Sequence, residues 1–146
     1  MSKSNTFENS LLLLLFNNTA ITDIGDAGGL RATATAGSLW VAFHTADPGE
    51  AGSAITSETA YTGYLRVAVA RSGAGWVVTG NSLSPAANVD APECTASAGG
   101  PITHFSVVNT SSGAGIILYS GTMTPNITMA VGVIPRLKST TTITED

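Results

Sequence analysis

A strand-loop-strand stretch at residues 38–71 constrains the fold more than any other part of the sequence. Its first arm, SLWVAFH, and its second arm, YLRVAVAR, both alternate large apolar residues with other residues. A period of two predicts half-buried β-strands. Between the arms lie the 19 residues 45–63, with a turn signal at Asp47-Pro48-Gly49. A loop of this length in a compact domain is typical of a functional segment, so Asp47, Pro48, Gly49 and Glu50 are candidate contact residues.

Residues 5–17 predict one helix. Asn5 or Thr6 can cap it, and Glu8 lies three positions after Asn5, as in a capping box. A wide apolar stripe predicts that the helix is buried on more than one side, either in the core or in a subunit interface. The members of its main face are further candidate contacts: Phe7, Leu11, Leu14 and Leu15.

The rest of the chain predicts a β-protein. Residues 18–37 are rich in glycine and alanine and predict an arm or linker, and residues 38–146 predict a β core. The core contains about eight short strands, including a hairpin at residues 66–79, an irregular strand at residues 81–89 that Pro85 confines to an edge or a bulge, and strands at residues 102–108, 116–120 and 126–129. We therefore expect one all-β domain over residues 1–146, an antiparallel β-sandwich or jelly roll with one N-terminal α-helix.

The composition limits the kinds of partner that this chain can bind. Only 11% of residues are charged, against about 25% in ordinary soluble domains. Such a surface is typical of extracellular β-proteins and of subunits covered by partners. The net charge is −4 and the six Lys and Arg form no cluster in sequence, so we expect no direct nucleic-acid binding. The apolar run at residues 11–16 is too short for a signal peptide or a membrane span.

No motif predicts catalysis. His44 lies three residues before Asp47, which would suit a His-Asp-Ser or two-histidine metal site, but His44 and His104 both fall inside strand patterns. Cys94 predicts a structural thiol. The loop acids, including Glu58, lack the spacing of a calcium loop. We therefore expect no catalytic residue, no metal and no cofactor.

The sequence resembles a family of small bacteriophage structural proteins labelled tail fibre-like. The matching residues are TFENSLL at 6–12, LWVAFHTADPGEAG at 39–52, YLRVAV at 64–69, THFS at 103–106, SSGAGIILYSG at 111–121 and TITED at 142–146. The HTADPGEAG segment is the most specific of these. The resemblance spans nearly the whole chain.

The resemblance implies a virion structural protein without enzymatic activity, made in the host cytoplasm. Long trimeric fibres usually show repeats or heptads, and this sequence has neither. The first interpretation is therefore a jelly-roll cement or decoration protein, a homotrimer that binds the major capsid protein on the capsid surface. The alternative is a tail fibre or tail-tip component for host recognition, whose exposed loops and Trp or Tyr residues would bind a host glycan. An enzyme using His44 and His104 ranks third.

Overall fold

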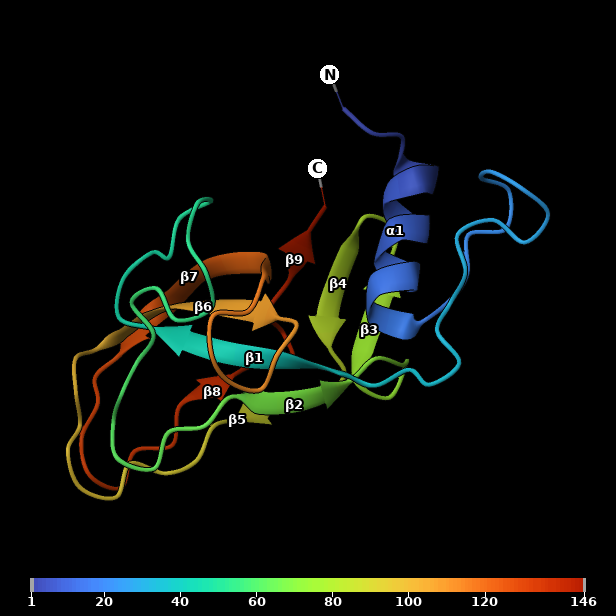
Figure 1. Ribbon diagram of the computed structural model, residues 1–146. Helices are drawn as coiled ribbons and strands as arrows, with labels where there is room; N and C mark the ends of the chain where they lie inside the picture. The colour runs from blue at the N-terminus through green and yellow to red at the C-terminus, as the bar shows by residue number, and fades with distance from the viewer. Residues whose placement is uncertain (1, 146) are drawn as a thin grey trace. The chain divides into compact units, whose positions relative to one another are not determined.

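The computed structural model describes residues 2–145, which form one helix and nine strands (Figure 1). Their bounds are α1 (Asn5–Asn17), β1 (Ser38–His44), β2 (Val67–Ala70), β3 (Trp76–Thr79), β4 (Ser82–Pro85), β5 (Val89–Asp90), β6 (Ile102–Val108), β7 (Ile117–Ile127), β8 (Arg136–Leu137) and β9 (Ile143–Thr144). The pairs β1–β6, β6–β7, β3–β4, β4–β9 and β5–β8 are antiparallel, and the predicted class, an all-β sandwich fold with one N-terminal helix, is confirmed.

The described residues fall into two compact units. The first contains residues 2–38, 69–87 and 138–145, and the second contains residues 39–68 and 88–137. The expected organisation as a single domain stays a prediction.

Helix α1 of the first unit is capped by Ser4 rather than by Asn5 or Thr6. The Ser4 side chain accepts a hydrogen bond from Phe7 N, and its carbonyl accepts one from Glu8 N. Asn18 ends the helix in the left-handed conformation, with φ of 54°. Serine is as good a cap as asparagine, and a cap at Ser4 lets the helix begin at Asn5, so the predicted bounds are correct although the predicted cap is wrong.

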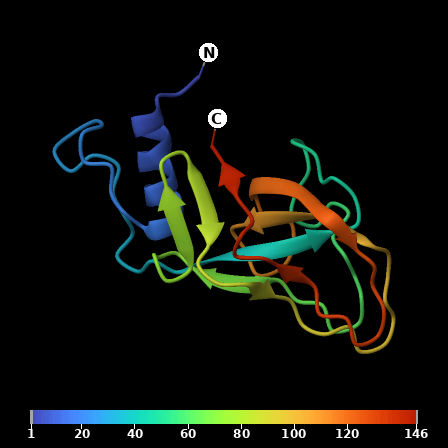
Figure 2. The same cartoon turned by 180° about the vertical axis from the view of Figure 1, so that it is seen from behind.

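One face of α1 packs against β3 and β4, which lie beside it in both views (Figure 2). The buried helix residues are Glu8, Leu12 and Phe16, spaced four apart. The Phe16 ring meets the Trp76 ring edge to face, with centroids 5.0 Å apart. Burying a side chain of this size contributes about 1.5–3 kcal/mol, so this face anchors the helix.

The sheet of the first unit has the order β3-β4-β9. The hairpin predicted at residues 66–79 is therefore wrong, because β3 pairs with β4 and not with β2. Of the two positions predicted for Pro85, an edge or a bulge, the edge is wrong, since β4 is the middle strand. Proline fits there because Pro85 is the last residue of β4, where it lies opposite Trp76, while β9 pairs only with Ser82 and Leu83.

Residues 18–37 form a loop that is tied to itself. The Asn18 amide donates to the Thr33 carbonyl at 2.8 Å and accepts from the Thr33 backbone at 2.9 Å. Ile21 and Leu30 exchange backbone hydrogen bonds of 2.9 and 2.8 Å further along the loop. Beyond them, residues 22–28 are exposed.

The second unit is built on strands β1, β6 and β7, in a sheet ordered β2-β1-β6-β7. β1 and β6 pair from Trp40 opposite Val108 to His44 opposite His104. Their buried residues form much of this unit's core: Val41, Ala42, Phe43, Phe105, Val107 and Val108. β7 replaces two shorter predicted strands, and Pro125 lies inside it.

Candidate contact surface

The long loop at residues 45–63 is closed at its base. Thr45 N donates to the Ser57 carbonyl at 2.8 Å, and Thr59 N donates to the Phe43 carbonyl at 2.9 Å. His44 and Glu58 form an isolated antiparallel bridge between these bonds. These contacts hold the two ends of residues 46–56 side by side, and the loop tip is short enough to have a defined structure.

A buried ion pair holds the returning arm of the loop. Arg66 Nε lies 2.7 Å from Glu58 Oε1, and Nη2 lies 2.7 Å from Oε2. The Arg66 side chain is 2% exposed and that of Glu58 is 15% exposed. This two-pronged geometry is the strongest form of the arginine-carboxylate contact. The Glu58 hydrogen bond is the main reason why the pKa of Arg66 is raised.

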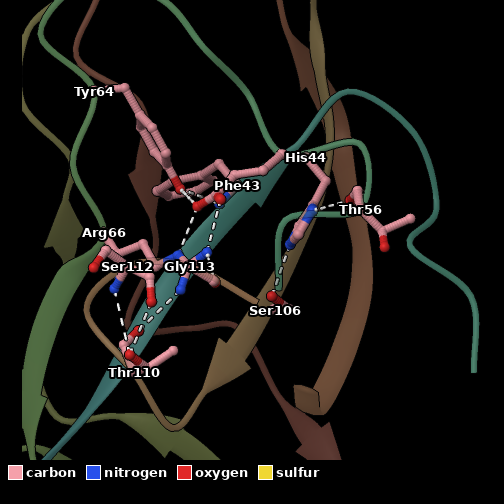
Figure 3. Close-up of polar contacts among 10 residues, drawn as sticks. Phe43, His44, Thr56, Tyr64, Arg66, Ser106, Thr110, Ser112 and Gly113 are labelled. Carbon is pink, nitrogen blue, oxygen red and sulfur yellow. Dashed lines mark hydrogen bonds and ion pairs between the residues drawn. The ribbon is translucent and has the colours of Figure 1, made fainter. Parts of the chain in front are cut away.

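The same guanidinium reaches a second loop (Figure 3). Arg66 Nη1 donates to the Thr110 carbonyl at 3.1 Å, and Nη2 donates to the Gly113 carbonyl at 2.8 Å. Tyr64 joins the cluster, because its hydroxyl donates to Glu58 at 2.9 Å and accepts from Phe43 N at 3.1 Å. Burial raises the pKa of the Tyr64 hydroxyl, which keeps it a donor. The cluster thus joins the loops before β2 and before β7.

His44 fixes the loop tip from the end of β1. Its Nδ1 lies 2.9 Å from the Thr56 carbonyl, and its Nε2 lies 2.7 Å from Ser106 Oγ. A carbonyl only accepts, so Nδ1 carries the proton and the Ser106 hydroxyl donates to Nε2. Burial is the main cause of the lowered pKa of His44, which favours this neutral ring.

A serine that donates to a histidine resembles the start of a hydrolase site, but its surroundings differ. His44 and Ser106 are both fully buried, so no substrate can meet the hydroxyl. The acid partner that orients such a histidine is replaced by the Thr56 carbonyl. Asp47, the acid considered from the sequence, is exposed and bonds instead to Gly49 N. The pair is therefore a structural support for the loop.

The turn at the loop tip follows the predicted chemistry. The Asp47 carboxylate accepts from Gly49 N at 2.9 Å, and Gly49 has φ of 68°, where glycine costs least. Gly52 N donates to the Gly49 carbonyl at 3.1 Å. A Cβ at Gly52 would lie 2.0 Å from the Pro48 carbonyl, so only glycine fits. The tip is a compact turn with Pro48 buried beneath it.

A groove of about 570 Å³ lies between this turn and the start of β7. The two segments that line it are joined by a hydrogen bond from Ala54 N to the Gly115 carbonyl at 2.9 Å. Its lining residues come from the two segments only: Asp47, Gly49, Glu50, Gly52 and Ser53 on one side, and residues 114–120 on the other. Asp47 and Glu50 are exposed and bring negative charge to this groove.

The predicted contact residues thus fall into two places. Asp47, Gly49 and Glu50 line the groove of the second unit, while Pro48 packs below the turn. The helix residues belong to the first unit, where all four are partly exposed: Phe7, Leu11, Leu14 and Leu15. These four residues, which we call the leucine stripe, are therefore not the buried face of α1, and their role as a contact surface stays a prediction.

Sequence reasoning missed both residues that organise the loops. The sequence places Arg66 in a strand pattern and Glu58 among the loop acids. Neither position predicts the ion pair that these two residues, eight positions apart, form with each other. The available signal was Arg66 itself, a charged residue between the apolar Leu65 and Val67. Such a residue is rarely buried without a partner.

The structure adds two findings about chemistry. Among residues 2–145, no group of three or more His, Cys, Asp or Glu side chains is placed to hold a metal ion. In the same part of the chain, no helix combines the length and apolar character needed to cross a bilayer.

Comparison with known proteins places the chain among phage structural proteins. The family model described as podophage GP4 fiber I protein gp80 matches residues 2–144. No curated protein matches the chain at a significant level. The match spans nearly all of the sequence, including the helix, the loop at residues 45–63 and β7. The chain therefore belongs to the podophage GP4 fiber I protein gp80 family, a family of bacteriophage fibre proteins.

Proposed function

We propose that this chain is a non-enzymatic structural subunit of a podophage fibre and that it acts by contacting other virion proteins. The observation that carries the proposal is the pairing of a fibre-family sequence with a rigidly held loop and groove at residues 45–63 and 114–120. A site built for assembly needs a fixed surface, and the Arg66 cluster provides one. The buried His44 and Ser106 pair supports a structural role as well.

The leucine stripe of α1 is the second proposed contact. Phe7, Leu11, Leu14 and Leu15 are partly exposed, while Leu12 and Phe16 already anchor the helix to its own unit. Apolar side chains left partly in water gain free energy when a partner covers them. A homotrimer joined through this stripe would present three copies of the groove to the rest of the virion, and repeated weak contacts would add by avidity.

A capsid cement protein remains the second candidate. Its support is the absence of heptads and repeats from the sequence, together with short strands and few charges. A subunit that binds the assembled shell but not its precursor stabilises the shell by mass action. In that case the major capsid protein is the partner.

Gold labelling of purified virions with a specific antibody separates these functions. Label on the tail or its fibres is the result that the fibre proposal predicts. Label spread over the head would overturn it in favour of the cement function. Particles without label, and without the chain in an immunoblot, would contradict both.

The helix contact has its own test. The Leu11→Asp/Leu14→Asp variant should remain folded by circular dichroism but lose its oligomeric state in light scattering. Leu12→Ala is the matched control, because Leu12 is fully buried in the core. That control should lower the unfolding temperature, with a loss of about 2–5 kcal/mol, and leave the oligomer intact in the folded fraction. An Asp variant that unfolds, or that keeps its oligomeric state, would contradict the helix contact.

A further inference from the structure

The groove runs along the open edge of a strand. Within residues 2–145, β7 is the last strand in the order β2-β1-β6-β7, so one side of its start faces no neighbouring strand. Side chains of a strand alternate between faces, and a groove on one face would be lined by every second residue. This groove is lined by four consecutive residues of β7, 117–120, and by residues 114–116 of the loop before it. It therefore follows the backbone edge of the strand.

This part of the edge lacks the usual protection against pairing. Proteins blunt exposed edges with proline, charged side chains or covering segments. Residues 114–124 contain no charge and no proline, and Pro125 protects only the far end of β7. Ile116 is 65% exposed at the near end. An undefended edge beside a shaped groove is a place where an extended chain can add a strand.

The charges of the groove indicate what kind of chain fits. Asp47 and Glu50 lie opposite the strand, and no Lys or Arg is among the lining residues. A second copy of this chain is a poor occupant, since its net charge is −4. Four of its six cationic side chains are already held in contacts: Lys3, Arg66, Arg71 and Arg136.

We propose that the groove binds an extended segment of a different virion protein, which pairs with residues 117–122 of β7 and places a Lys or Arg against Asp47 and Glu50. The inference rests on the proposed function and names the partner surface. Backbone hydrogen bonds along β7 supply the affinity, and the acidic turn selects a basic segment. The Arg66 cluster keeps the turn at a fixed distance from the strand, since it joins both loops.

Photo-cross-linking in the phage tests the proposal. A photoreactive amino acid replaces Ser120, which is exposed and lines the groove, and the matched control places it at the exposed Ala27. Both chains are produced in infected cells, and purified virions are irradiated. Mass spectrometry then identifies the cross-linked peptides.

The expected result is a cross-link from position 120 to a short segment of another virion protein that contains Lys or Arg, with no such product from position 27. A cross-link to a second copy of this chain, to a segment without a cation, or to nothing would overturn the inference. An immunoblot of the same virions distinguishes these outcomes from failure of the proposed function, which would leave the chain absent from the particles.

Charge variants provide a second readout. Asp47→Asn/Glu50→Gln removes two charges, while the asparagine oxygen can still accept from Gly49 N. It should lower the cross-link yield roughly fivefold, since exposed charge pairs contribute modestly. Asp23→Asn/Asp26→Asn removes the same charge from the exposed loop of the first unit and should leave the yield unchanged. Equal effects of the two pairs would contradict charge selection by the groove.

Discussion

Two arginines flank β2, and each holds a long loop in a different way. Arg66 precedes the strand and forms a two-pronged ion pair with Glu58 in the second unit. Arg71 follows the strand and bonds to neutral acceptors in the first unit. Those acceptors are the carbonyls of Leu14, Leu15 and Ala36, with further contacts to Asn18 and Thr33.

The two arginines differ in which groups would lose their partner if the arginine were replaced. Without Arg66, Glu58 is a charge with a 15% exposed side chain and no cation beside it. Without Arg71, the helix loses a cation at the end where its dipole favours one, but water can bond to the freed carbonyls. The loop that lines the groove is thus held by an ion pair, while the exposed loop of the first unit is held by hydrogen bonds from Arg71 to neutral acceptors.

Arg66→Met should have the largest effect. Removing one partner of a buried pair typically costs about 3–5 kcal/mol, so we expect a loss of this size in the free energy of unfolding measured with urea. Adding Glu58→Gln should restore part of the loss, because the uncompensated charge disappears. A loss below about 1 kcal/mol would contradict the role of the ion pair as anchor.

Arg71→Met should have a smaller effect. Hydrogen bonds to a charged group contribute about 1.5–3 kcal/mol, and we expect a loss in that range by the same measurement. Arg31→Met is the control, since Arg31 is exposed in the same loop and its replacement should stay within about 0.5 kcal/mol. If Arg71→Met cost as much as Arg66→Met, the contrast between the two anchors would fail.

His44 should make the loop sensitive to acid. Its folded pKa is lowered mainly by burial, so below about pH 6.5 the unfolded chain binds a proton that the folded chain does not. Stability is therefore fully present above that pH and falls on acidification, by at most about 1.4 kcal/mol per pH unit. His44→Gln should flatten this dependence between pH 7 and 5. An unchanged slope would show that another group is responsible.

Asp47→Asn should have the smallest effect on stability. The asparagine oxygen can keep the hydrogen bond from Gly49 N, and the lost charge is exposed, so the change should stay within about 0.5 kcal/mol. Thermal unfolding at pH 7 measures it. A larger loss would mean that the carboxylate supports the fold and not only the charge of the groove.

The sequence predicts the parts of the fold that depend on local signals. The helix at residues 5–17, the strands at 38–44 and 102–108 and the turn at Asp47-Pro48-Gly49 all follow from periodicity and turn chemistry. The same local signals indicate the acidic turn at Asp47 to Glu50, which makes up half of the candidate contact surface.

The errors concern pairings between distant residues. β2 and β3 are separated by a loop of hairpin length, yet β2 belongs with β1 and β3 pairs with β4, because tertiary packing decides the partner. The same reason explains why the groove was missed, although a strand at residues 116–120 was predicted. Residues 114–120 meet the turn only through the fold, and no local pattern in either segment indicates the other.

The central claim is that the groove along β7 is the assembly surface, and incorporation into virions tests it most directly. Ser120→Lys blocks the edge with a charge, and Ala27→Lys makes the same change on the exposed loop of the first unit. Phage lacking the chain would be complemented with each variant, and copies per particle would be counted by quantitative mass spectrometry. We expect the number of Ser120→Lys copies per particle to fall roughly tenfold, which corresponds to about 1.4 kcal/mol of binding free energy. The number of Ala27→Lys copies should match the wild type. Normal incorporation of a folded Ser120→Lys chain would contradict the claim.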